Sequence, residues 1–320
     1  QSLISTHCFL GTSHTKTPRG IMGRIRLNKT NVKDVEWFLE QMDKSTTDGS
    51  ASIPTFIKPF HLACIAIHAK MSDSNISLPS QSEIEKYAVR MGLWEAIGKE
   101  PPYQVNRLSC DGRFVEARAV ETDDDVHSSS VEVSEMFART GTCKSTTESL
   151  QILAAELLGN CCAHSSDESI FGIVTGQVWH KGNLAQLCIV DCGNGIRRSL
   201  ENNEGLTERL TQDNACQLAT EYGITGKPFG HHSGYGLTLT NDLITQNEGC
   251  LIVVSGNECY VNCEGTVEAL TLDYSWSGTL IIFEWNTDTT LDVTPIYDSW
   301  PTSESLTDET EEDLYGQLFD

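Results

Sequence analysis

The chain has 320 residues, and its 45 acidic against 22 basic residues give a formal net charge of −23. A hydrophobic fraction of 39% and an aromatic fraction of 8% fit a soluble globular protein, and the length suffices for two domains. No run of about 18 apolar residues occurs, so a membrane-spanning helix is not expected. Residues 228–320 hold 17 acids and no Lys or Arg, which disfavours direct binding of nucleic-acid phosphates by this region.

The twelve cysteines show neither a Cys-x-x-Cys pair nor the Cys and His spacing of a zinc site. Four of them, Cys161, Cys162, Cys188 and Cys192, fall in segments where free thiols act as small hydrophobes. Reduced thiols are therefore expected, and with them a cytoplasmic location.

Residues 1–100 alternate between strand-like and helix-like patterns. The expected elements are a strand over residues 21–27, helices over 32–42, 60–70 and 82–97, and a second strand over 75–79. Asn31 is placed to cap the first helix, and Pro59 to begin the second. This alternation predicts a small α/β domain that ends near Pro101-Pro102.

A second domain is expected over residues 101–290. Apolar runs over residues 113–120, 187–190 and 281–285 predict strands, and the acidic, serine-rich stretch 122–130 predicts a loop. Residues 291–320 form an acidic C-terminal tail, whose last part has too few apolar residues to fold alone.

A polar stripe marks the helical run that begins near residue 149. Glu156, Asn160 and His164 recur there every four residues, and this spacing stacks their side chains on one side of a helix. Leucines surround the stripe, so burying it is costly unless a polar group or a ligand faces it.

Two glycine-rich segments follow this helix in the chain. The first, Asp191-Cys-Gly-Asn-Gly, comes directly after the apolar strand 187–190, where glycines allow a ligand to approach the backbone closely. The second, Gly234-Tyr-Gly-Leu, opens a helical pattern whose first N–H groups would meet phosphate oxygens. No Gly-x-x-x-x-Gly-Lys-Ser/Thr motif occurs, so backbone groups and Mg²⁺ would have to meet the phosphate charge.

The order and spacing of these three elements resemble the nucleotide-binding boxes of the GHKL superfamily, over residues 149–286. This superfamily includes DNA gyrase, heat-shock chaperones, histidine kinases, anti-sigma serine kinases and mismatch-repair ATPases. The resemblance implies an α/β sandwich, with a mixed sheet and helices on one face, that binds ATP and Mg²⁺. Residues 1–100 are similar to the STAS-like segment that precedes this domain in some bacterial ATP-binding proteins.

The resemblance also implies roles for single residues. Asn160 would hold Mg²⁺, and Glu156 would be the general base. Asp191 would accept a hydrogen bond from the adenine amine, which Thr279 would help to hold through water. The other residues implied at the nucleotide are His164, Gly193, Gly195, Ile196, Lys227, Ser233, Gly234, Tyr235, Gly236 and Leu237.

Residues 197–230 would form a lid over the nucleotide, with Lys227 close enough to reach the γ-phosphate. A structural role without ligand contact stays open for His164 and for Lys227. We expect a slow ATPase whose lid closure regulates a protein partner or its own dimer. Two alternatives stay open, namely an anti-sigma type serine/threonine kinase, in which Glu156 deprotonates a hydroxyl, and a nucleotide-sensing module without turnover.

Overall fold

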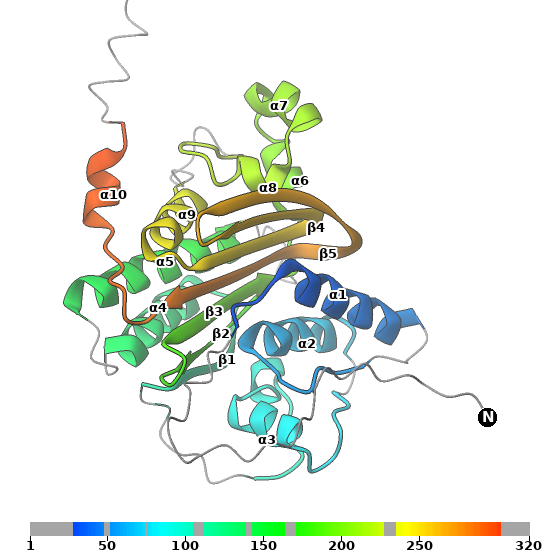
Figure 1. The fold of residues 1–320 in the computed structure, drawn as a ribbon. Helices are drawn as coiled ribbons and strands as arrows, with labels where there is room; N and C mark the ends of the chain where they lie inside the picture. Colours follow the sequence, from blue (N-terminus) through cyan, green and yellow to red (C-terminus); the bar gives the residue numbers. More distant parts are fainter. Residues whose placement is uncertain are drawn as a thin grey trace, which may run out of the picture.

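The computed structural model describes residues 28–47, 52–73, 76–104, 110, 112–138, 143–163, 171–226 and 235–301. These residues form a five-stranded sheet in the order β1-β2-β3-β5-β4, in which every neighbouring pair of strands is antiparallel (Figure 1). The strands are β1 Phe114–Val120, β2 Gly172–Trp179, β3 Leu184–Asp191, β4 Cys250–Cys263 and β5 Thr266–Asn286. The α-helices are α1 Val32–Thr47, α2 Pro59–Met71, α3 Glu83–Arg90, α4 Asp123–Ala138, α5 Lys144–Ala163, α6 Ile196–Leu200, α7 Thr207–Gln212, α8 Ala215–Leu218, α9 Gly236–Asn247 and α10 Thr294–Ser299, with 3₁₀ turns η1 Glu95–Ile97 and η2 Glu204–Leu206.

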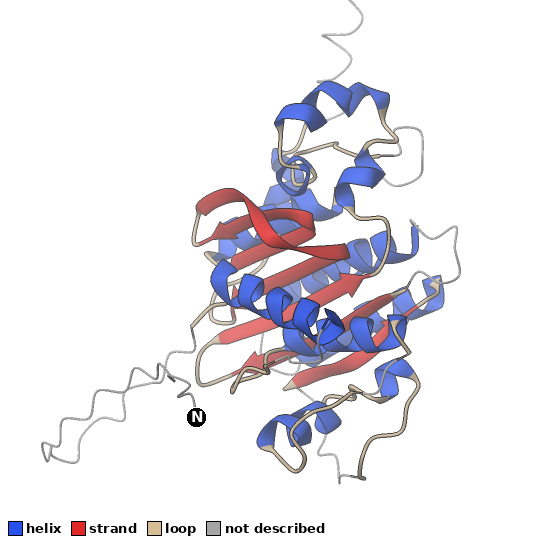
Figure 2. Cartoon of the chain, turned by 90° about the vertical axis from the view of Figure 1, so that its right-hand side faces the viewer, coloured by secondary structure: helices blue, strands red, loops and turns tan. Residues whose placement is uncertain are grey.

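Helices cover both faces of the sheet (Figure 2). The central strand β3 shows why, because it is buried on both of its faces. Leu187 and Ile189 belong to the hydrophobic cluster that includes α5 and α9, whereas Cys188 and Val190 belong to the cluster that includes α1 and α2. A strand that is apolar on both faces requires a helical layer on each side.

The expected mixed sheet is wrong, because every strand pair of the described sheet is antiparallel. The described helices of residues 101–290 lie on one face, as expected, whereas α1 and α2 from the first 100 residues cover the other face. The separate α/β domain expected for residues 1–100 is also not what the described part of this segment forms. Residues 76–79 adopt no strand, and the strand expected over 21–27 lies outside the described residues. Helix α2 is apolar nearly all round, with ten of its 13 residues buried, so it packs on β2 and β3 as the second helical layer of the same sheet.

The local signals in this segment were mostly correct. Helix α1 follows Asn31, whose Oδ1 accepts from the N–H of Asp34 at 3.0 Å, and α2 begins at Pro59 as expected. The single helix expected over 82–97 is divided into α3 and η1. Gly92 lies between them with φ = 73°, a left-handed conformation that ends a regular helix.

The loop expected over residues 122–130 is wrong, because this stretch begins helix α4. The Thr122 hydroxyl accepts from the N–H of Asp125 at 3.2 Å, and the carboxylate of Asp125 accepts from the N–H of Thr122 at 2.9 Å. This reciprocal pair satisfies donors at the helix start, where three consecutive aspartates also interact favourably with the helix dipole. The acidic, polar composition therefore signals a helix N-terminus.

A buried polar network joins the N-terminal segment to the sheet. The carboxylate of Glu284 on β5 accepts from the backbone N–H of Thr30 at 2.6 Å, from Nε2 of Gln186 at 2.6 Å and from Nζ of Lys58 at 3.2 Å. Lys58 also donates to the Thr30 hydroxyl at 2.8 Å. The Glu284 side chain is 0% exposed, so these hydrogen bonds replace the contacts with water that it loses on folding.

The hairpin of β4 and β5 extends past the sheet and bends back (Figure 1). The pairing register shifts on both sides of Gly256, which has φ = 60°. The far end of β4 returns to its beginning, since the N–H of Glu264 donates to the carbonyl oxygen of Gly249 at 2.9 Å. Among the helices of the described residues, none has the length and apolar character needed to cross a membrane.

Candidate functional site

A cavity of about 350 Å³ lies between α5, the end of β3, the start of α9 and β5. Its lining brings together ten of the residues that the sequence predicted at a nucleotide site: Glu156, Asn160, Asp191, Gly193, Gly195, Ile196, Tyr235, Gly236, Leu237 and Thr279. The other four predicted residues, His164, Lys227, Ser233 and Gly234, lie outside the described residues. Segments more than 100 residues apart in the chain therefore meet at one site.

The first polar group of the cavity is the Asp191 cluster, formed by Asp191, Gly193 and Thr279. Oδ1 of Asp191 accepts from the N–H of Gly193 at 2.8 Å and from the N–H of Thr279 at 3.2 Å. Burial raises the pKa of Asp191 to about 6, although these hydrogen bonds favour the ionised form. At neutral pH the cavity therefore contains a poorly solvated carboxylate that can accept further hydrogen bonds.

Gly278 permits this contact between β3 and β5. Its φ is 94°, and a Cβ atom at this position would overlap the carbonyl oxygen of Asp191. No role was predicted for Gly278 from the sequence, although it stands directly before Thr279. Without a side chain at residue 278, the N–H of Thr279 reaches the carboxylate of Asp191.

Ser255 on β4 fixes the turn that follows the Asp191 cluster. Its hydroxyl accepts from the N–H of Ile196 at 2.8 Å and donates to the carbonyl oxygen of Gly278 at 2.8 Å. Gly195 has φ = 80°, and a Cβ atom there would lie 2.7 Å from the Ser255 hydroxyl. Glycine at residue 195 thus allows both the left-handed backbone conformation and the close contact with Ser255.

The second polar group is the α5–α9 cluster, formed by Glu156, Asn160 and Gly236. Helix α9 begins at Gly236 as predicted, and the side chain of its N-cap residue, Tyr235, makes no capping hydrogen bond. A Cβ atom at Gly236 would lie 3.3 Å from Nδ2 of Asn160 and 3.3 Å from Cβ of Glu156. The missing side chain therefore brings the N–H groups at the start of α9 next to the polar stripe of α5.

The charge of the cavity limits what it can bind. Its described lining residues include the carboxylates of Glu156 and Asp191 and no Lys or Arg. Within the described part of the chain, no group of three or more His, Cys, Asp or Glu side chains is placed to hold a metal ion. An anionic ligand at these residues would thus need hydrogen bonds from backbone N–H groups. A cation would need to be coordinated by Asn160 together with oxygen atoms of the ligand.

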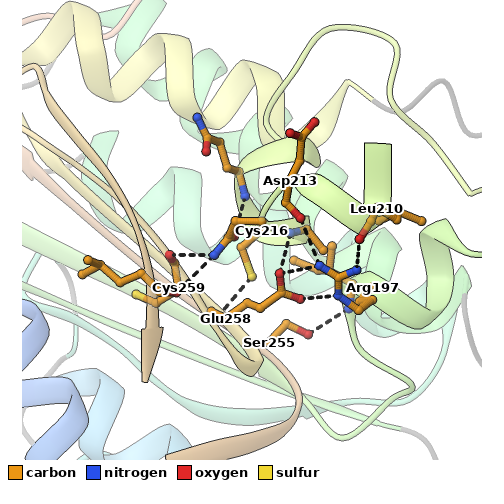
Figure 3. Close-up of polar contacts among 12 residues, drawn as sticks. Arg197, Leu210, Asp213, Cys216, Ser255, Glu258 and Cys259 are labelled. Atoms are coloured by element: carbon orange, nitrogen blue, oxygen red, sulfur yellow. Dashed lines mark hydrogen bonds and ion pairs between the residues drawn. The ribbon is translucent and has the colours of Figure 1, made fainter. Parts of the chain in front are cut away.

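The segment expected to be a lid is largely folded and attached to the sheet (Figure 3). Arg197 makes two hydrogen bonds of 2.7 Å to the carboxylate of Glu258 on β4 and donates to the carbonyl oxygens of Leu210 and Asp213. Glu258 also accepts from the N–H of Ala215 at 2.7 Å. These contacts hold helices α6, α7 and α8 against the outer hairpin.

Replacing Arg197 with methionine should lower the free energy of unfolding by about 1–2 kcal/mol, because a carboxylate would lose its paired donors at a partly exposed site. Limited proteolysis should then cut the chain within residues 197–226 faster than in the wild-type protein. Arg198 is exposed and adjacent, so Arg198→Met is the matched control. Equal cleavage rates in the two variants would show that Arg197 does not attach this segment.

Aromatic rings connect this segment to the C-terminal helix beside the cavity. Tyr222 stacks on Tyr235 with ring centroids 4.8 Å apart, and Trp300 lies 5.2 Å and 5.1 Å from these two rings. Trp300 also donates from Nε1 to Asp242 on α9 at 3.1 Å. The cluster holds Tyr222 and Tyr235 together and ties both residues to the C-terminal end of the described chain.

The site thus combines two kinds of chemistry in one cavity. The Asp191 cluster can accept a hydrogen bond from an amine, and the α5–α9 cluster offers backbone donors, an amide and a carboxylate. No known protein-family model matches this chain, and no curated protein is significantly similar to it in sequence.

Proposed function

We propose that this protein binds Mg²⁺–ATP in the cavity and hydrolyses it slowly as a conformational switch. The proposal rests on one observation above all. A partly buried carboxylate and the start of helix α9, the latter beside Glu156 and Asn160, line the same cavity. The carboxylate suits a nucleobase that carries an exocyclic amine. The start of α9, with Glu156 and Asn160 beside it, suits the phosphates and an attacking water molecule.

Asp191 would select adenine. Its Oδ1 is already engaged by the N–H groups of Gly193 and Thr279, which fix the orientation of the carboxylate. The amine of adenine is a hydrogen-bond donor, whereas guanine carries an acceptor oxygen at the corresponding position. A carboxylate at this place favours the donor and repels the acceptor.

The phosphates would lie at the α5–α9 cluster. The N–H groups at the start of α9 would donate to phosphate oxygens, because the side chain of the N-cap residue Tyr235 does not bond to them. Asn160 would hold Mg²⁺, which offsets the phosphate charge when it is bound. The absence of a side chain at Gly236 supports this fit, since a Cβ atom there would lie within 3.3 Å of Asn160 and crowd the space between the two helices.

Glu156 would take the proton from the attacking water molecule. Glu156→Ala should reduce phosphate release by about 10²–10⁴-fold, while ATP affinity changes by less than about threefold. The assay follows γ-labelled ATP, measuring free phosphate and protein-bound label together. Glu148→Ala is the matched control, because Glu148 is exposed on the same helix and lies two turns earlier.

A Glu156→Ala protein that binds ATP normally and hydrolyses it at the wild-type rate would contradict the role of Glu156 as base. Label on the wild-type protein or on an added STAS protein would instead identify a kinase. Binding without either product would identify a nucleotide sensor.

ATP affinity should also depend on pH through Asp191. Burial raises the pKa of Asp191 to about 6, and the ionised carboxylate accepts from the adenine amine more strongly than the neutral acid, which also carries a competing O–H donor. Affinity should therefore fall by up to about tenfold for each pH unit below about 6, after correction for protonation of ATP itself. Titrations between pH 5 and 8 test this, and an Asp191→Asn protein should lack this component of the pH profile.

A further inference from the structure

Two cysteines lie close together where β4 folds back on itself. The N–H of Glu264 donates to the carbonyl oxygen of Gly249 at 2.9 Å, so the two ends of β4 meet. Cys250 follows Gly249 and Cys263 precedes Glu264 in the chain, and a hydrogen bond joins the two thiols. A disulfide needs two cysteines whose Cα atoms lie about 4.4–6.8 Å apart, and thiols in hydrogen-bond contact are placed for it.

The two thiols differ in their surroundings. Cys250 is buried, and its thiol donates to the carbonyl oxygen of Thr30 at 3.6 Å. Cys263 is partly exposed, and Lys29 lies close to it, forming an ion pair with Glu264 at 2.9 Å. A hydrogen bond between the thiols and the charge of Lys29 lower the pKa of Cys263, whereas the same hydrogen bond and burial raise the pKa of Cys250.

This asymmetry is absent from the neighbouring buried thiols Cys216 and Cys259. Both are buried, and burial raises the pKa of each. Cys143 is exposed and its pKa is lowered, but its thiol contacts the hydroxyl of Thr146 at 3.2 Å in place of a second thiol. Among these cysteines, Cys263 alone combines solvent access, a stabilised thiolate and an adjacent thiol partner.

We propose that Cys250 and Cys263 form a dithiol site that peroxide oxidises to a disulfide, with Cys263 as the reacting thiol and Cys250 as the resolving thiol. The Cys263 thiolate attacks hydrogen peroxide, the O–O bond breaks, and water leaves after protonation, so that Cys263 becomes a sulfenic acid. The thiol of Cys250 then attacks this sulfur, the S–O bond breaks, and a second water molecule leaves. In total, the two thiols lose two electrons and two protons, and peroxide is reduced to two water molecules.

Disulfide formation would change contacts beyond the two sulfurs. The thiol of Cys250 would no longer donate to Thr30, which is also a hydrogen-bond partner of Glu284. The bond would fasten the far end of β4, and with it the hairpin that carries Glu258, to the start of the strand. The site therefore lies between the N-terminal segment and the hairpin that holds the α6–α8 helices.

The test uses the full chain with Cys143→Ser, which removes an exposed thiol of lowered pKa. The protein is treated with a small excess of hydrogen peroxide, quenched with N-ethylmaleimide in denaturant and mapped without reduction by mass spectrometry. We expect a peptide pair linked through Cys250 and Cys263, formed at least about tenfold faster than the thiols of Cys216 and Cys259 are lost. With Cys250→Ser added, Cys263 should remain a sulfenic acid that dimedone labels.

Two results would overturn the proposal. The first is oxidation of Cys216 and Cys259 as fast as that of Cys250 and Cys263. The second is a folded Cys250→Ser protein, judged by circular dichroism, in which dimedone labels a residue other than Cys263. If that variant does not fold, iodoacetamide labelling of the unoxidised parent protein decides, since Cys263 must then react faster than Cys250.

Discussion

Glu284→Ala should lower the free energy of unfolding by about 3–5 kcal/mol, because it leaves a buried charge without its partner. The side chain of Glu284 is fully buried and accepts from Thr30, Gln186 and Lys58. Its removal leaves the ammonium group of Lys58 without its anionic partner in a site that is itself only 10% exposed. Urea denaturation followed by circular dichroism measures the change.

The double variant Lys58→Met, Glu284→Leu is the informative control. Replacing both charges with apolar residues removes the unpaired charge, so this protein should be more stable than Glu284→Ala alone. Glu264→Ala is a matched surface control, since its ion pair with Lys29 is 65% exposed on the Glu264 side and should contribute less than about 1 kcal/mol. A loss below about 1 kcal/mol for Glu284→Ala would show that the network does not hold the N-terminal segment to the sheet.

Asp191→Asn should weaken ATP binding by about 10- to 100-fold, the largest effect on binding expected from one near-isosteric change. The asparagine oxygen can still accept from the N–H groups of Gly193 and Thr279, so the local fold should persist. The amide nitrogen, however, places a donor where the proposed adenine amine also donates. Isothermal titration calorimetry with ATP and Mg²⁺ measures the change in affinity.

Asp288→Asn serves as the control for this substitution. Asp288 accepts from Asn183 at 2.9 Å just after β5 ends, and it is not part of the cavity lining. Its exchange should leave ATP affinity unchanged within about twofold. Equal affinities of the Asp191→Asn and wild-type proteins would show that Asp191 does not recognise the base.

The elements of the site were predictable because each carries a local signal. The four-residue spacing of Glu156 and Asn160 marks one side of α5, the apolar run before Asp191 marks β3, and Gly236 opens α9. All three elements occur as predicted, and the cavity brings them together. Periodicity and glycine placement suffice for such elements, since they act within a few residues of the chain.

The features that the sequence did not reveal depend on distant contacts. Arg197 and Glu258 lie 61 residues apart in the chain, and neither has a local pattern that announces their pairing. The same holds for the cluster of Tyr222, Tyr235 and Trp300. The antiparallel sheet with two helical layers was missed for a similar reason, because apolar periodicity shows that a helix buries one side and does not show which surface it meets.

Titration of the wild-type protein with ATP and with GTP, each in the presence of Mg²⁺, tests the proposed adenine-nucleotide site most directly. Calorimetry should show one ATP bound per chain and GTP binding at least about tenfold weaker, since guanine places an acceptor where Asp191 requires a donor. Millimolar ATP that gives no binding signal, or equal affinities for the two nucleotides, would contradict the assignment of the cavity to adenine nucleotides.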